Sequence, residues 1–215
     1  MLSLRPLQRA LDGVYCTGVS QSVDAFVRPL DPRDPEAARR EVVLVEPGNG
    51  ARPTGVAVML DPAVSRALEG ERVAGMSRFD AWCLALEGVS HFVLLAYRAD
   101  NDRPVTELEL EFQAEVDKFV VGVVEQVDGR SATDAERRST RLRRALYGRE
   151  RFVDGASTVR GKRYRLAQRL AARYAHALER RYVRYARLRG LVEEVREFYR
   201  AGLADKWAWV GDGAG

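Results

Sequence analysis

The sequence is poor in the residue types that carry most catalytic and metal chemistry. Among 215 residues it has two cysteines, Cys16 and Cys83, and two histidines, His91 and His176. Two cysteines are too few for a disulfide framework or a structural zinc site of their own. The phosphate-binding GxxxxGK[ST] and GxGxxG loops, the GxSxG elbow, HExxH and CxxC are all missing. Any histidine-based mechanism must therefore use His91 or His176.

Long apolar runs are also lacking. No run approaches the length of a membrane span, and the first 18 residues contain no apolar core typical of a signal peptide. We therefore expect a soluble, cytoplasmic protein.

Proline is missing from the second half of the chain. All eight prolines lie at or before Pro104, and proline breaks helix interiors. We predict an α+β protein with a boundary at this point. Residues 1–104 would form an acidic mixed part with a small antiparallel sheet and short helices. Residues 105–215 would form an arginine-rich helical part with one long helix, and we expect the two parts to pack together as one compact unit.

The first part alternates short apolar runs with turn residues. The runs 42–45 and 56–60 flank the turn-rich Pro47-Gly48-Asn49-Gly50 and predict an antiparallel hairpin. Asp61 with Pro62, and then Ser77, predict two helix starts. We expect Gly88 to interrupt the second helix. The segment from His91 to Tyr97 is apolar on both faces, so periodicity leaves it open between a buried strand and a continued helix.

Clear helix signals follow Pro104. Thr106 with Glu109, and Thr133 with Glu136, have the spacing of capping boxes. They predict helices to Val127 and to Tyr147.

A longer periodic pattern comes next. Its apolar positions recur every three or four residues, and Gly190 is a candidate break within it. The members of this seam are Tyr164, Ala167, Ala171, Tyr174, Leu178, Arg181, Tyr185, Leu188, Val192, Val195 and Tyr199. We expect the seam to pack inside the chain. The alternative is a homodimer or larger structural oligomer through Tyr174, Leu178 and Leu188.

Charge divides unevenly along the chain. Residues 1–129 carry 13 basic and 21 acidic side chains, a balance of −8, whereas residues 130–215 carry 22 and 10, a balance of +12. Guanidinium groups bind phosphate in bidentate fashion. We predict a basic helical surface for an acidic partner, either nucleic acid or protein, with tyrosines interleaved among the arginines. Its binding residues would be Arg137, Arg138, Arg141, Arg144, Lys162, Arg165, Arg169 and Arg173.

Two enzyme hypotheses remain beside this prediction. His91 lies near several glutamates in sequence, a combination that could bind a divalent metal in a hydrolase. These are Glu87, Glu107, Glu109, Glu111 and Glu115. Arg169 and His176, separated by six residues, are similar to the R-x(4–6)-H motif of HEPN ribonucleases, although Leu170 replaces the polar residue that usually follows the arginine. That resemblance implies a helical, dimeric ribonuclease. Our leading expectation is a non-enzymatic interaction protein without a metal or cofactor.

Overall fold

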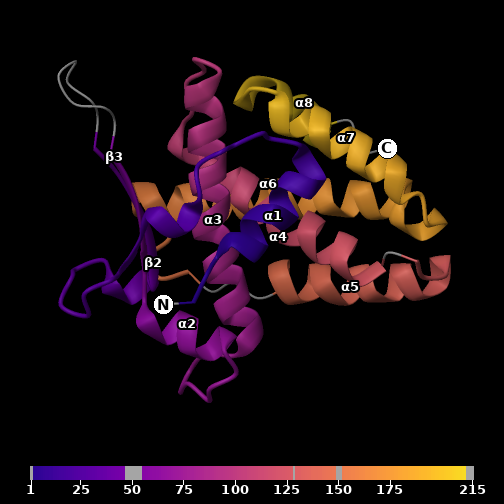
Figure 1. The fold of residues 1–215 in the computed structure, drawn as a ribbon. Helices are drawn as coiled ribbons and strands as arrows, with labels where there is room; N and C mark the ends of the chain where they lie inside the picture. Colours follow the sequence, from indigo (N-terminus) through magenta and orange to yellow (C-terminus); the bar gives the residue numbers. More distant parts are fainter. Residues whose placement is uncertain (1, 47–54, 128, 149–151, 212–215) are drawn as a thin grey trace. The chain divides into compact units, whose positions relative to one another are not determined.

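The protein has an α+β fold with a small mixed sheet near the N-terminus and a long helical region after it (Figure 1). The structure is a computed structural model that describes residues 2–46, 55–127, 129–148 and 152–211. The chain forms two compact units, the first made of Met1–Ala10 and Thr17–Arg103, the second of Leu11–Cys16 and Pro104–Gly215. Helix α1 (Arg5–Tyr15) contributes residues to both units.

A three-stranded sheet of order β1-β3-β2 organises the first unit. Strands β2 (Glu41–Glu46) and β3 (Gly55–Leu60) pair antiparallel with Val43 opposite Val58, which confirms the predicted hairpin. The Pro47–Gly50 turn expected between them lies outside the described residues. Strand β1 (Val27–Pro29) adds parallel to β3. The short 3-10 turns η1 (Val23–Ala25) and η2 (Ala37–Arg39) precede β1 and β2, respectively.

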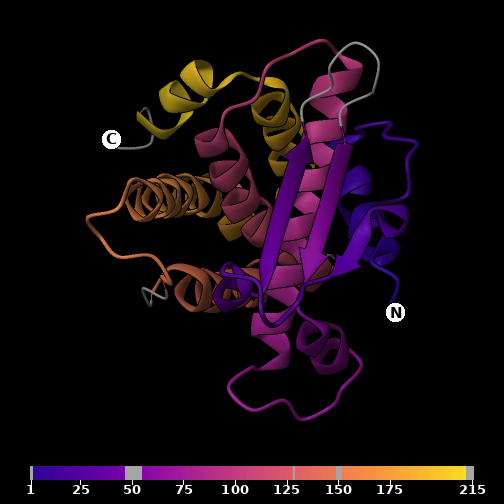
Figure 2. The ribbon, with the colours of Figure 1, turned by 90° about the vertical axis from the view of Figure 1, so that its left-hand side faces the viewer.

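Helix α3 (Arg78–Asp100) packs against β2 and β3 and forms the centre of the first unit (Figure 2). It begins at Ser77, whose hydroxyl accepts from the backbone N–H of Asp80 in a capping box. The expected interruption at Gly88 is wrong, because the helix continues through it. A Cβ at Gly88 would lie 2.8 Å from Val58 Cγ1, so the glycine permits close helix–sheet packing. The His91–Tyr97 segment is therefore helical.

Helix α3 also bears on the expectation that no segment could span a membrane. Its length and composition would allow it to cross one. However, 56% of its most apolar 18-residue window is buried inside the protein, which is typical of the core helix of a soluble protein. Helix α2 (Pro62–Leu68) packs beside it, with Asp61 accepting from Ala63 N–H as the predicted N-cap.

The second unit is helical and begins with α4 (Glu107–Val127), as predicted. The Thr106 hydroxyl accepts from the backbone N–H of Glu109 at its start. Helix α5 (Ala132–Tyr147) has its N-cap at Ser131, two residues before the predicted cap Thr133, because the Ser131 hydroxyl accepts from Asp134 N–H and leaves Thr133 inside the helix. Helices α6 (Val159–Arg181), α7 (Leu188–Arg200) and α8 (Leu203–Gly211) follow.

The seam predicted from Tyr164 to Tyr199 is divided between α6 and α7. The break does not occur at Gly190 but before it, at the 3-10 turn η3 (Val183–Tyr185) and Ala186, whose backbone is left-handed at φ 53°. Gly190 has a different role, because a Cβ there would lie 2.8 Å from the ring of Tyr182. The glycine thus lets α7 approach the end of α6 closely.

The core of the second unit contains stacked aromatic rings and also a buried, charged side chain. Phe198 of α7 stacks on Tyr174 of α6 at 4.2 Å between ring centroids, and both side chains are fully buried. Lys206 is also fully buried, and its Nζ lies 3.1 Å from Glu109 Oε1 and 2.8 Å from Gln113 Oε1. A buried charge needs a partner of this kind, because desolvation would otherwise be very costly.

Candidate functional site

Helices α5 and α6 pack side by side in antiparallel directions (Figures 1 and 2). One buried carboxylate connects them. Glu179 of α6 is 1% exposed and accepts hydrogen bonds from the hydroxyls of Ser139 and Thr140, both at 2.8 Å. It also lies 3.0 Å from Arg143 Nε. Arg184, just after α6, pairs with Glu136 near the start of α5, as expected for antiparallel helices.

These contacts determine the ionisation of Glu179. Burial alone would raise the pKa of this carboxyl. The hydrogen bonds from Ser139 and Thr140 and the charge of Arg143 outweigh burial and hold the pKa of Glu179 below its ordinary value. Glu179 is therefore ionised at neutral pH and holds the two helices together.

The outward side of α6 carries a continuous row of basic side chains. Its members recur every three or four residues, so they share one helix face opposite the buried Ala167, Ala171, Tyr174 and Leu178. The row consists of Lys162, Arg165, Arg169, Arg173, His176 and Arg180. Eighteen residues separate its ends, which is about 27 Å along the helix.

Helix α5 carries a second row. Arg137, Arg141 and Arg144 lie on the side opposite the buried Ala135 and Leu142. Both helices also contact α4 and each other, so their polar faces both point away from the core of the second unit. The two rows therefore lie on neighbouring helices and on the same side. The predicted α5 residues therefore lie on a helix that packs beside the helix of the predicted α6 residues.

Some of the predicted binding residues are already engaged. Arg137 and Arg138 both bind Asp134, at 2.6 and 2.8 Å, and the hydrogen bonds from Arg138 and Arg137 lower the pKa of Asp134 to about 2. Arg165 donates to the carbonyls of Asp154 and Gly161 and lies over the ring of Phe152 at 4.3 Å. The side chains of these three arginines therefore contact neighbouring parts of the same chain and stabilise local structure.

The remaining predicted residues are exposed and unengaged. Within the described part of the chain, none of their side chains makes a hydrogen bond or ion pair, and the same holds for the side chain of Arg180, which the prediction omitted. We call this set the cation face. It consists of Arg141, Arg144, Lys162, Arg169, Arg173 and Arg180.

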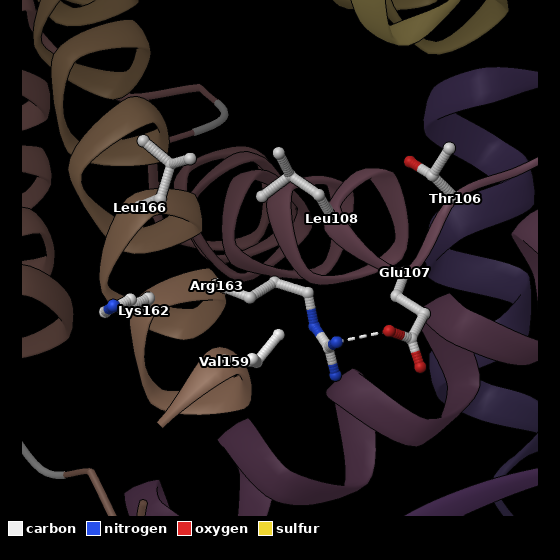
Figure 3. A pocket seen from close by; sticks show the side chains of 7 residues that line it. All are labelled: Thr106, Glu107, Leu108, Val159, Lys162, Arg163 and Leu166. Atoms are coloured by element: carbon white, nitrogen blue, oxygen red, sulfur yellow. Dashed lines mark hydrogen bonds and ion pairs between the residues drawn. The ribbon is translucent and has the colours of Figure 1, made fainter. Parts of the chain in front are cut away.

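An open pocket of about 420 Å³ lies beside Lys162, between the start of α4 and the start of α6 (Figure 3). Leu108, Val159 and Leu166 give it an apolar lining. Arg163 reaches across it to the carboxylate of Glu107 and forms an ion pair. Because Glu107 neutralises Arg163, Lys162 is the cation that this end contributes to the cation face.

The two histidines have different surroundings. His91 is 6% exposed on α3, and its Nδ1 lies 3.7 Å from Glu41 Oε1 of β2. Glu41 is a neighbour that the sequence did not indicate. The glutamates expected near His91 at positions 107, 109, 111 and 115 belong to α4 in the second unit. Their described partners include Arg163 for Glu107, Lys206 for Glu109 and Lys118 for Glu115.

His176 lies in the α6 row. Its side chain is 45% exposed, and its Nδ1 is 3.8 Å from Glu179 Oε2. Arg169 shares this face, so the two residues of the HEPN-like pair both reach solvent. The dimer residues are less accessible. Tyr174 and Leu178 are fully buried within one chain, so a homodimer through them would require the second unit to open.

Comparison with known proteins does not assign a family or a function to this site. The chain has no significant match to a protein-family model, to a curated protein or to a solved structure.

Proposed function

We propose that the protein is a non-enzymatic, cytoplasmic nucleic-acid-binding protein that contacts phosphates through the cation face. The observation that carries this proposal is the row of exposed guanidinium groups without carboxylate partners on two neighbouring helices. Positive charge that the protein leaves uncompensated is available to a polyanion, and each phosphate contact releases condensed counterions. The contacts would position a backbone rather than distinguish bases.

The chemistry of the surface favours nucleic acid over an acidic protein. Protein interfaces have an apolar core rich in aromatic and aliphatic side chains. In the described residues, the exposed large hydrophobic side chains of the second unit are Val153, Val159, Tyr185 and Trp207. None of these lies between Arg169, Arg173 and Arg180 on α6, where the surface is cationic and polar.

Charge reversal on the cation face tests the proposal. We would measure the affinity of the full-length protein for a fluorescein-labelled 20-nucleotide RNA by anisotropy at low salt. The double variant Arg169→Glu/Arg173→Glu should lose at least about tenfold in affinity, since it replaces two attractive phosphate contacts by repulsion. The double variant Arg5→Glu/Arg9→Glu is the matched control, because it makes the same charge change at the same four-residue spacing on α1, where both side chains are exposed and lie outside the face. Equal losses in both variants would contradict the proposal.

The same assay separates the alternative functions. Binding of polyglutamate in preference to RNA is the result expected for an acidic protein partner. Cleavage of the RNA by the wild-type protein, abolished by His176→Ala, would instead support a HEPN-like ribonuclease at Arg169 and His176. Retention of full RNA affinity by the Arg169→Glu/Arg173→Glu variant would leave the cation face without a function.

A further inference from the structure

Tyr185 differs from every other tyrosine in the chain. Its side chain is 62% exposed, whereas the other seven tyrosines are buried or half-buried. The seam periodicity predicts a core position for Tyr185, and this prediction is wrong because the chain leaves the helix at η3. Packing in the core therefore does not account for this exposed aromatic ring in the arginine-rich part of the chain.

The turn that presents Tyr185 is fixed by several contacts. Val183 is fully buried beneath it, and Arg184 is paired with Glu136 at 2.8 Å. The backbone N–H of Tyr185 donates to the Tyr182 carbonyl at 3.1 Å. Ala186 closes the turn in the left-handed conformation and donates to the Val183 carbonyl. The ring is thus held outward by an ordered backbone, which lowers the entropic cost of using it for binding.

One cation lies against this ring. The Arg187 guanidinium lies over it at 5.3 Å from the centroid, a cation–π geometry. Arg180, the last member of the cation face, is exposed in the final turn of α6, and η3 follows that helix after the single residue Tyr182. Tyr185 therefore follows the last residue of the cation face by five positions along the chain.

An exposed aromatic side chain next to a basic track is the arrangement by which proteins bind single strands. The backbone follows the cations, and an unpaired base stacks on the ring. A duplex keeps its bases paired and stacked and cannot use such a ring in this way. We infer that Tyr185 is a stacking platform for an unpaired base, so that the cation face takes single-stranded nucleic acid. This inference rests on the proposed function and specifies its ligand.

The test compares single-stranded and double-stranded ligands on the full-length protein. Anisotropy titrations would use a labelled 12-nucleotide oligo-dT and a labelled 12-base-pair duplex. Tyr185→Ala should weaken oligo-dT binding about tenfold and leave duplex binding unchanged, because it removes one stacking contact and no charge. Tyr185→Phe and Tyr185→Trp keep an aromatic face and should retain the affinity of the wild type.

Matched controls make each outcome decisive. Trp207→Ala removes the other exposed aromatic side chain of the described residues, on α8, and should change neither affinity. Thermal unfolding of each variant verifies the fold. Unchanged oligo-dT affinity in Tyr185→Ala, or equal losses for both ligands, would overturn the stacking role, while the Arg169→Glu/Arg173→Glu variant tests the phosphate contacts independently. Absence of any binding by the wild-type protein would overturn the proposed function and this inference together.

Discussion

Arg143 on α5 and Glu179 on α6 lie 3.0 Å apart, and this pair joins the two helices that carry the cation face. The carboxylate is buried, whereas the guanidinium is partly exposed at the rim of the helix–helix contact. Because Glu179 is bound by three groups of α5, the rows on the two helices are held in a constant register. The unpaired arginines beyond this contact are therefore presented on a rigid surface.

Glu179→Ala should destabilise the protein by about 2–4 kcal/mol. The substitution leaves buried hydroxyls without an acceptor and Arg143 without its counter-charge. A buried polar group without a partner destabilises the folded state by more than a typical hydrogen bond stabilises it. Urea unfolding followed by circular dichroism would measure the change in the free energy of unfolding. Glu193→Ala, at an exposed i,i+4 pair with Arg189, is the control and should cost well under about 1 kcal/mol. Similar costs for both substitutions would contradict the bridging role of Glu179.

Acid should weaken the same helix–helix contact. The pKa of Glu179 is lower in the folded protein than its ordinary value of about 4.3, so the stabilisation is complete above that value. It is lost as the pH falls through the lower folded pKa. Unfolding free energies measured between pH 6 and pH 3 should therefore decline more steeply for the wild-type protein than for Glu179→Gln. Parallel pH profiles would show that the carboxylate does not gain its stabilisation from ionisation.

Gly88→Ala should destabilise the first unit by about 1–3 kcal/mol, although alanine favours helices. The added Cβ would lie 2.8 Å from Val58 Cγ1 and 3.0 Å from Glu41 Oε1, so the sheet and α3 would have to separate. Gly13→Ala in α1 is the matched control, because a Cβ there meets no atom within 4 Å. It should be neutral or stabilise by up to about 1 kcal/mol. Thermal unfolding of both variants measures the difference, and a neutral Gly88→Ala would contradict the packing described for α3.

Local chemistry made parts of this fold predictable from the sequence. Asp61 before Pro62, and Ser77 before Asp80, each satisfy backbone N–H groups within one turn, so the helix starts at these positions follow from neighbouring residues. The break after Arg181 did not follow in this way. Tyr185 and Leu188 keep the three-and-four spacing of the seam although the chain leaves the helix between them, because periodicity records the spacing of residues and not the left-handed turn at Ala186.

The composition of the site was predictable from the sequence, but its pairing was predictable only in part. The eight predicted binding residues could be selected from charge and helix position. Arg137 and Arg138 pair with Asp134 three and four residues away, so helix spacing alone could have indicated that they are engaged. The pairs of neighbouring arginines could not be found in this way, because Glu107 meets Arg163 across 56 residues and Glu179 meets Arg143 across 36 residues.

The salt dependence of binding tests the central proposal most directly. We would measure the association constant for single-stranded RNA between 50 and 300 mM salt, for the wild-type protein and for Arg169→Gln/Arg173→Gln. Each phosphate contact contributes about 0.7 to the slope of log K against log salt for a single strand. The proposal predicts a steep wild-type slope that becomes shallower by about 1.4 in the double variant. Equal slopes, or wild-type binding that does not depend on salt, would contradict it.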